Sequence, residues 1–293
     1  MLERIDHMIC AVPDLEAASA AYERLGLTLT PRTLNAATGN ANRACFVGTN
    51  PANFSYLELL TVVDEAQGNS PGRQAYLETA ANGGGMVGLV FGVASAEQAS
   101  ADLVSRGYPA PVESFNRPDG SHLIDIAAVD TKGAIPFRCS VANYPETWEA
   151  RYERSRATGR FGHTFPLKRL DHLAAMAPDL EATTRFWGEA LGVPVFGEIT
   201  TPVLIIRQLK IGDAILELLG PASPDSPMAS RPASLASMAA WEVSGSLADA
   251  VELARSRGFT ASDPEAGVIP GTRRASIPAA ELGGIGMQLL EYV

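Results

Sequence analysis

The sequence is poor in features that mark several large classes of protein. Its 293 residues hold 23 lysines and arginines against 33 aspartates and glutamates, a formal net charge of −10. Because nucleic-acid binding needs a basic face, this balance argues against a DNA or RNA partner. The longest apolar runs, such as GLVFGVA, are far too short to span a bilayer. We therefore expect neither a nucleic acid nor a membrane as a partner.

Cysteine is scarce as well. Cys10, Cys45 and Cys139 cannot all pair, and none stands in a Cys-X-X-Cys spacing, so we expect reduced, buried thiols. No charged-then-apolar leader precedes Ile5, which favours a cytoplasmic protein. Hydrophobic residues make up 46% and charged residues 19%, which is typical of a globular chain with a sizeable core.

Histidine is also rare, yet two of the four histidines stand at matching places in a repeated segment. IDHMICAVPDLEA at 5–17 returns as LDHLAAMAPDLEA at 170–182. In each copy a short apolar strand carries the histidine, His7 or His172. The Pro-Asp pair then ends the strand, and its aspartate is placed to cap a helix.

Each copy continues with a helix that closes on Leu-Gly, and then with three strands. The last strand of each copy contains Leu-Glu-Leu-Leu, with Glu58 or Glu217. The expected strands are 27–32, 41–48 and 54–62 in the first copy, and 193–199, 202–212 and 214–221 in the later copy.

Two further stretches, 88–110 and 239–261, repeat this layout more weakly, and strands follow both. The chain therefore reads as four βαβββ modules. Because one module cannot bury its own sheet face, modules pack against one another. We predict an α+β fold with two domains of paired modules, joined by a polar, partly helical bridge. The predicted boundaries are 1–145 for the first domain, 146–167 for the bridge and 168–293 for the second domain.

The repeated glutamates present a physical problem that the histidines can solve. Side chains alternate across a strand, so Glu58 shares a face with Tyr56. A carboxylate on a covered sheet is costly unless a positive or hydrogen-bonding group meets it. Imidazole and carboxylate groups on neighbouring strands can bind a divalent metal. The pattern therefore indicates a metal site in each repeat.

These segments resemble the vicinal oxygen chelate (VOC) superfamily, which includes glyoxalase I, methylmalonyl-CoA epimerase, extradiol dioxygenases and bleomycin-resistance proteins. The resemblance rests on DH…PDLEA…LG with YLELL or ILELL. The N-terminal half is most similar to the glyoxalase-like domain, also through NRPDGSHL at 116–123. The C-terminal half resembles a glyoxalase- or epimerase-type domain, through GIGMQLLEYV at 284–293. The resemblance implies curved mixed sheets.

In that superfamily the first strand of a module supplies a His or Gln ligand and the last strand a Glu. The second and fourth modules have Gly88 and Ala239 at the opening position, and Arg138 stands where the second module's carboxylate is expected. Arg138 could instead form a buried ion pair with Glu58 in place of a metal. Pairing of modules within each half or across the halves stays open. The metal ligands implied by the resemblance are His7, Glu58, His172, Glu217 and Gln288.

Other residues are candidates for binding a substrate. His122 follows a Pro-Asp-Gly turn signal. His163 lies in the bridge, where we expect it at the surface, and the arginine-rich segment 150–160 is typical of a solvated helix face. The candidates for substrate binding are Tyr56, His122, Arg138 and Trp241.

Three functions compete. The first is a metal-dependent lyase or isomerase for a small metabolite with adjacent oxygens, with a divalent ion (Fe, Mn, Zn, Ni, Co or Mg) as Lewis acid and Glu217 or Glu58 as base. The second is an extradiol-type ring-cleaving dioxygenase, which needs two histidines and a carboxylate on Fe(II). The third is a metal-free binding or resistance protein that would use Tyr56, Trp187 and Trp241. In each case the partner is a small molecule, and the chain is a monomer or homodimer.

Overall fold

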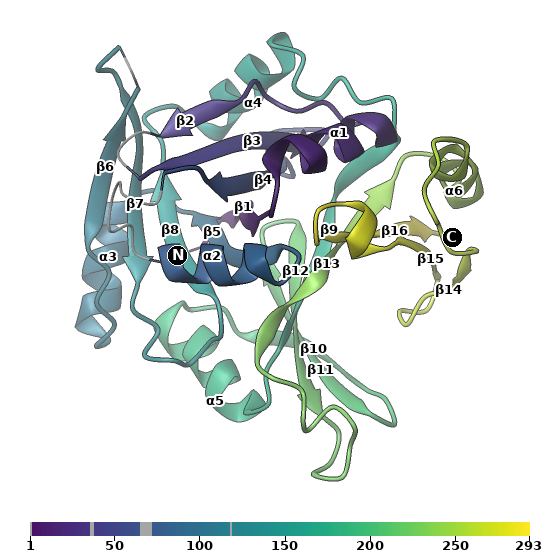
Figure 1. The fold of residues 1–293 in the computed structure, drawn as a ribbon. Coiled ribbons are helices and arrows are strands. Elements are labelled where there is room, and N and C mark those ends of the chain that lie inside the picture. The colour runs from purple at the N-terminus through teal and green to yellow at the C-terminus, as the bar shows by residue number, and fades with distance from the viewer. Residues whose placement is uncertain (1, 36–37, 65–71, 118) are drawn as a thin grey trace. The chain divides into compact units, whose positions relative to one another are not determined.

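The computed structural model describes residues 2–35, 38–64, 72–117 and 119–293. Each module begins with a strand, continues through a helix and ends with three strands (Figure 1). The first module comprises β1 (Arg4–Ala11), α1 (Leu15–Leu25), β2 (Thr33–Asn35), β3 (Asn40–Val47) and β4 (Ser55–Val62). The second comprises β5 (Gly85–Gly92), α3 (Ala96–Ser105), β6 (Val112–Asn116), β7 (His122–Val129) and β8 (Arg138–Asn143).

The later modules repeat this order. The third comprises β9 (Leu167–Met176), α5 (Leu180–Arg185) with a π-helical turn (Phe186–Ala190), β10 (Val195–Thr200), β11 (Leu204–Ile211) and β12 (Ala214–Pro221). The fourth comprises β13 (Ser234–Val243), α6 (Leu247–Ser256), β14 (Glu265–Ala266), β15 (Thr272–Ile277), a 3₁₀ turn (Ala279–Glu281) and β16 (Gly286–Tyr292). Two helices lie between modules, α2 (Arg73–Ala81) and α4 (Trp148–Ala157).

The strands form two eight-stranded mixed sheets with matching topology. The first has the order β2-β3-β4-β1-β5-β8-β7-β6, and the second has the order β10-β11-β12-β9-β13-β16-β15-β14. Within each module the first strand pairs in parallel with the last, and the remaining pairs are antiparallel. The predicted α+β fold of four repeated modules is confirmed.

Residue contacts group the chain into two compact units. The first contains the residues up to 6 together with 88–150 and 172–236, and the second contains 7–87, 151–171 and 237–293. The division into domains over 1–145 and 168–293 stays a prediction. No helix among the described residues is long and apolar enough to cross a bilayer.

The predicted helix caps form. The Asp14 side chain accepts hydrogen bonds from the backbone N–H groups of Glu16 and Ala17, and Gly26 ends α1 with a left-handed φ of 93°. The expected strand at 27–32 is wrong, because the strand β2 begins only at Thr33. Pro31 lacks the N–H that a strand pairing here would need.

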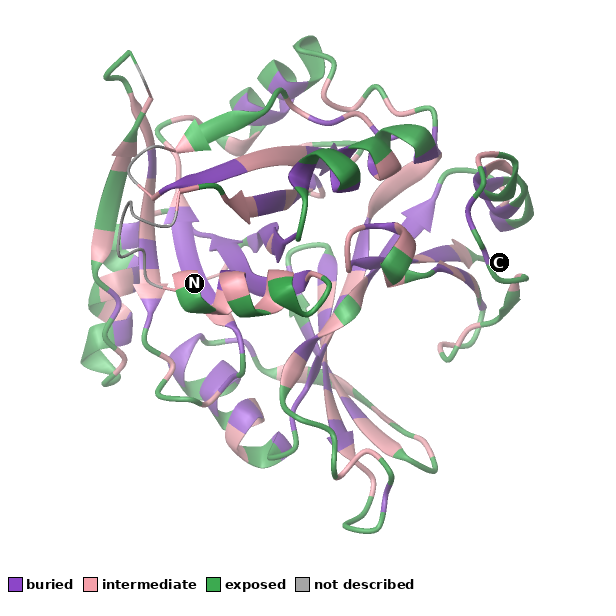
Figure 2. Cartoon of the chain, viewed as in Figure 1, coloured by how far each residue is buried: buried purple, intermediate pink, exposed green. Residues whose placement is uncertain are grey.

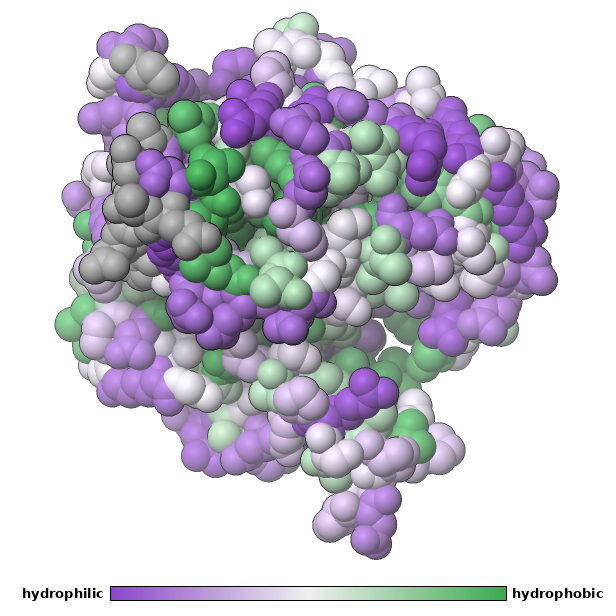
Figure 3. Space-filling model, in the orientation of Figure 1, coloured by the Kyte–Doolittle hydropathy of each residue, from purple (hydrophilic) through white to green (hydrophobic). Residues whose placement is uncertain are grey.

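Leucines on β4 alternate with polar residues as predicted. Leu57 and Leu59 are at most 2% exposed, whereas Tyr56 and Glu58 on the other face stay partly exposed. The leucine face packs against α1, whose exposed side is a mixture of charged residues and alanines (Figure 3). Burial of this kind contributes about 1.5–3 kcal/mol per leucine. Figure 2 shows the same burial along β5, where every residue is buried.

The three cysteines are free and buried, as expected. Burial raises the pKa of the Cys45 and Cys139 thiols to about 12. These thiols therefore stay protonated at neutral pH and act as small apolar core groups.

Candidate functional site

Three rings stand in one row across neighbouring strands of the second unit. His7 on β1 lies opposite Tyr56 on β4, and Tyr56 lies opposite Phe46 on β3. The His7 and Tyr56 ring centroids are 4.4 Å apart at an interplanar angle of 13°, and those of Tyr56 and Phe46 are 4.7 Å apart at 20°. These separations match the spacing of strands, so the register itself stacks the rings. We call His7, Tyr56 and Phe46 the ring row.

Glu58 lies beside the ring row, two residues beyond Tyr56 on the same face. Its Oε2 atom is 3.8 Å from His7 Nε2, which is too long for a hydrogen bond. Its Oε1 atom accepts a hydrogen bond of 2.5 Å from Asn42 Nδ2 on β3. The Glu58 side chain is 17% exposed and that of His7 is 5% exposed. Asn42 thus holds one carboxylate oxygen and leaves the other facing the imidazole.

The later repeat, in the first unit, has the same register with different neighbours. His172 lies opposite Ile215, and Glu217 follows two residues after Ile215. Glu217 Oε1 accepts a hydrogen bond of 3.0 Å from Nε2 of Gln208, which lies directly opposite on β11. Ile215 and Lys210 occupy the places that Tyr56 and Phe46 hold in the ring row.

The register corrects the expected position of Arg138. Arg138 lies opposite Gly88, just as Tyr56 lies opposite His7. Ser140, two residues further along β8, therefore stands at the position of Glu58, and the assignment of Arg138 to the carboxylate's place is wrong. The strands and loops between Gly88 and β8 differ in length from those of the first module, so sequence alone could not set this register.

A similar shift applies to the fourth module. Gln288 on β16 lies directly opposite Ala240, as Glu58 lies opposite Ile9. Gln288 therefore keeps its predicted match to the glutamates, but the histidine's position falls on Met238 rather than on Ala239. Gln288 belongs to the second unit.

A divalent metal would find two strong donors beside the ring row, His7 Nε2 and Glu58 Oε2. Catalytic zinc sites use three protein ligands, and non-haem iron oxygenases use two histidines and a carboxylate. Within the described ranges, no three His, Cys, Asp or Glu side chains are grouped closely enough to share an ion. His7 and Glu58 therefore supply two ligands, and no third His, Cys, Asp or Glu among the described residues joins them.

His122 lies at the start of β7, in the first unit, and Pro118 of its predicted turn lies outside the described residues. Its Nε2 atom is 3.1 Å from Asp125 Oδ2, while Ser114 Oγ donates to Asp125 Oδ1 at 2.6 Å. These hydrogen bonds, that of Ser114 above all, lower the pKa of Asp125. Because the serine contacts the aspartate and not the histidine, the three do not form a nucleophilic triad.

The two candidate tryptophans lie in the core. Trp241 is 1% exposed, and Trp187 is fully buried with its ring edge-on to Phe91 at 5.5 Å. Arg138 is partly buried on β8. Among the contacts that the structure describes, those of His7, Glu58 and Tyr56 define a candidate site.

The bridge contributes residues to the first repeat that sequence reasoning missed. His163 Nδ1 accepts a hydrogen bond of 2.9 Å from the Thr28 N–H, and its Nε2 lies 2.7 Å from the Phe46 carbonyl oxygen. A neutral imidazole satisfies both contacts, with Nε2 as the donor. Burial lowers the pKa of His163, which favours this form. The expectation that His163 lies at the surface is wrong, because Thr28 and the edge of β3 offer it partners.

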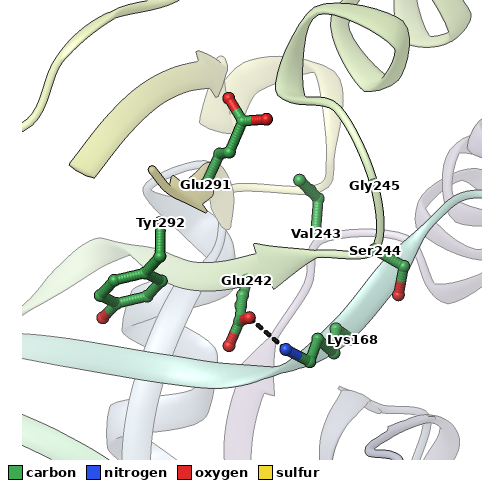
Figure 4. Close-up of a pocket in the computed structure, with 7 residues that line it drawn as sticks. All are labelled: Lys168, Glu242, Val243, Ser244, Gly245, Glu291 and Tyr292. Atoms are coloured by element: carbon green, nitrogen blue, oxygen red, sulfur yellow. Dashed lines mark hydrogen bonds and ion pairs between the residues drawn. The ribbon is translucent and has the colours of Figure 1, made fainter. Parts of the chain in front are cut away.

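A pocket of about 360 Å³ opens elsewhere in the second unit, where β9, β13 and β16 contribute its walls (Figure 4). Lys168 pairs with Glu242, which also accepts a 2.7 Å hydrogen bond from Arg169. Beside them, Tyr292 donates to Asp171 at 2.8 Å, and burial together with this bond raises the pKa of Tyr292 to about 12. Glu291, on the pocket's other side, lies 3.6 Å from Arg273, so each charged residue that lines the pocket has an ion-pair partner.

Two family models match the chain. One, described as a glyoxalase-like domain, matches residues 5–158, and the other, described as the glyoxalase/bleomycin resistance protein/dioxygenase superfamily, matches residues 171–275. The first match alone spans more than half of the sequence. The chain therefore belongs to the glyoxalase-like family of the VOC superfamily, as its repeats predicted.

Two solved structures that align with nearly the whole chain show the same fold. A triple mutant of 4-hydroxymandelate synthase from Streptomyces coelicolor matches 100% of this chain and 93% of its own, with 15% identity and a TM-score of 0.70. A hypothetical protein from Staphylococcus aureus matches 97% of each chain, with 10% identity and a TM-score of 0.67. Methylmalonyl-CoA epimerase from Mycobacterium tuberculosis matches 44% of this chain and 91% of its own, with 21% identity and a TM-score of 0.39. No curated protein matches the sequence.

Proposed function

We propose that the chain is an enzyme of the lyase or isomerase kind, which moves a proton on a small molecule that carries neighbouring oxygen atoms. The proposal rests on the carboxylate of Glu58. Asn42 holds its Oε1 atom, while Oε2 faces His7 at 3.8 Å without a hydrogen bond to it. A carboxylate fixed at one oxygen and available at the other is suited to act as a general base.

In the proposed step, Glu58 Oε2 takes a proton from a carbon next to a carbonyl group. The electron pair of the broken C–H bond moves into the carbonyl, and negative charge collects on its oxygen. His7 stands where its Nε2 can stabilise that charge or protonate the oxygen. Return of the proton at a neighbouring carbon completes an isomerisation, and expulsion of a neighbouring group completes a lyase reaction.

The surroundings support such a step. The Glu58 and His7 side chains are 17% and 5% exposed, and the ring row covers one flank of the pair. Exclusion of water strengthens the electrostatic effect of fixed groups on the developing charge. The stacking of His7 on Tyr56 also restricts the imidazole to one orientation.

Divalent metals are typical of this superfamily, and His7 and Glu58 are the residues that would hold one here. A bound ion would supply Lewis-acid stabilisation of the same enolate-like charge. Because two donors fall short of a three-ligand centre, we derive no step through a metal, and we expect turnover to survive dialysis against EDTA. Loss of turnover that one divalent ion restores would instead assign that stabilisation to the metal.

The test is exchange of C–H protons for deuterium in D₂O, monitored by NMR, with a panel of 2-oxo acids, 2-hydroxy ketones and hemithioacetals. We expect Glu58→Gln to lower the exchange rate by about 10²- to 10⁴-fold without weakening binding. Glu217→Gln, the matched change in the later repeat, should leave the rate unchanged. If Glu217→Gln instead lowered the rate and Glu58→Gln did not, the base would be Glu217. Oxygen uptake with catechols would contradict the proposal and indicate a dioxygenase.

A further inference from the structure

Arg160 lies at the end of the ring row in the second unit. Its guanidinium carbon stands 4.8 Å from the centroid of the Phe46 ring, on which it forms a cation–π contact. Within the ranges that the structure describes, the guanidinium makes no hydrogen bond and no ion pair. It is nevertheless partly buried. Its guanidinium is thus a partly covered cation whose hydrogen-bond donors are not used by any residue that the structure describes.

The end of α4 explains how Arg160 reaches this place. The Arg160 N–H bonds to the Ser155 carbonyl oxygen, and Gly159 has a left-handed φ of 74°. Together they form the C-terminal turn that commonly ends helices, in which glycine takes the left-handed position. The turn carries Arg160 away from the solvated face of α4 and over Phe46. The expectation that the whole segment 150–160 is a solvated face is therefore wrong.

The electrostatic surroundings of Arg160 are positive, although the chain carries a formal net charge of −10. Burial lowers the pKa of the Arg160 guanidinium, and repulsion from Arg154 and Arg151 lowers it further, while the smaller interaction with Tyr56 raises it. By contrast, Arg156 on the same helix is largely exposed and pairs with Glu153 at 2.7 Å. Local repulsion of this kind is relieved when an anion binds.

We propose that Arg160 binds the carboxylate group of the substrate, so that the enzyme acts on a small organic acid. The planar guanidinium matches a carboxylate in a charge-assisted, two-point hydrogen-bonded pair, which a neutral amide cannot form. The successive separations along the row, 4.4, 4.7 and 4.8 Å, place the guanidinium within about 14 Å of the His7 ring. For one acid to contact both Arg160 and Glu58, its reactive carbon must lie within a comparable distance of its carboxylate. This inference rests on the proposed function, but its test measures ligand binding and does not depend on turnover.

The experiment measures binding of succinate and benzoate, with succinamide, benzamide and inorganic phosphate as comparison probes. Ligand-observed NMR gives affinities, and thermal denaturation gives the ligand-induced shift in melting temperature. We expect the acids to bind the wild-type chain about 10-fold or more tightly than their amides. Arg160→Gln should abolish that preference, Arg160→Lys should restore part of it, and Arg156→Gln, the matched control, should keep it.

Several results would overturn the inference. These are equal affinity for acids and amides, an unchanged preference in Arg160→Gln, tighter binding of phosphate than of either acid, or no saturable binding of the acids at concentrations on the order of 10 mM. Glu58→Gln should bind the acids as the wild type does. Failure of the proposed proton transfer therefore shows in turnover, whereas failure of this inference shows in binding.

Discussion

The first and third modules share a register but surround it differently. In both, the first strand carries a histidine, and the last strand carries a glutamate opposite the residue two positions after that histidine. In the first module two aromatic rings extend the histidine's row, and in the third an isoleucine and a lysine take their places. The repeated backbone therefore sets where the carboxylate stands, while the side chains of the adjacent strands decide what it can do.

The carboxamide partners sharpen this contrast. Asn42 reaches Glu58 from a position two residues off the direct partner, whereas Gln208 reaches Glu217 from directly across. Each solution satisfies one oxygen of a partly buried carboxylate. In the first module an imidazole also stands 3.8 Å from the second oxygen.

The largest expected effect is on the free energy of unfolding, and it tests the buried leucine layer that the two modules share. Leu59 and Leu218 are both fully buried beside their module's glutamate. We expect Leu59→Ala and Leu218→Ala each to lower the free energy of unfolding by about 2–5 kcal/mol, because both leave a cavity in a close-packed layer. Denaturant titration measures this. A near-zero effect for one of them would break the equivalence of the two modules.

A smaller effect tests the carboxamides. We expect Asn42→Ala and Gln208→Ala each to cost about 1–2 kcal/mol of unfolding free energy, since each removes a hydrogen bond to a carboxylate that keeps some access to water. Only Asn42→Ala should also reduce turnover, because it frees Glu58 to rotate away from His7. If Gln208→Ala alone lowered turnover, the active site would lie in the third module.

The smallest effect concerns pH and the first module alone. The pKa of His163 is lowered in the fold, so the neutral imidazole is the form that folding favours. Its contribution to stability is therefore present above the usual value of 6.5 and is lost as the pH falls from there through the lowered pKa.

His163→Gln provides the matched control for this effect. A carboxamide can accept from the Thr28 N–H and donate to the Phe46 carbonyl without titrating. We expect the melting temperature of the wild type, measured between pH 7 and pH 5, to fall more steeply than that of His163→Gln. Parallel curves would show that His163 does not contribute to the acid sensitivity.

Much of the fold could be predicted from the sequence because its signals are local. Alternating leucines in Leu-Glu-Leu-Leu, the capping aspartates and the Leu-Gly helix ends each act over a few residues, and four copies of one pattern reinforce one another. The strand expected at 27–32 was wrong because a single proline removes a donor.

The site was predicted only in part because its remaining members depend on long-range pairing. Asn42 and Glu58 are separated by 16 residues, and His163 and Phe46 by 117. Nothing in the composition of the polar bridge distinguishes Arg160 from its solvated neighbours. The position of Ser140 likewise follows from a strand register that a comparison of short motifs does not contain.

The docking of the bridge on the first module bears on how that module can be studied alone. Tyr152 and Phe161 pack around Phe54 at 5.7 and 6.3 Å between ring centroids, and the Phe165 N–H bonds to the Gly26 carbonyl oxygen. An excised fragment that stops at residue 145 would expose these aromatic side chains to solvent and would be prone to aggregation. Any recombinant fragment, or any protease-resistant piece, that contains the first module should therefore extend past Phe165.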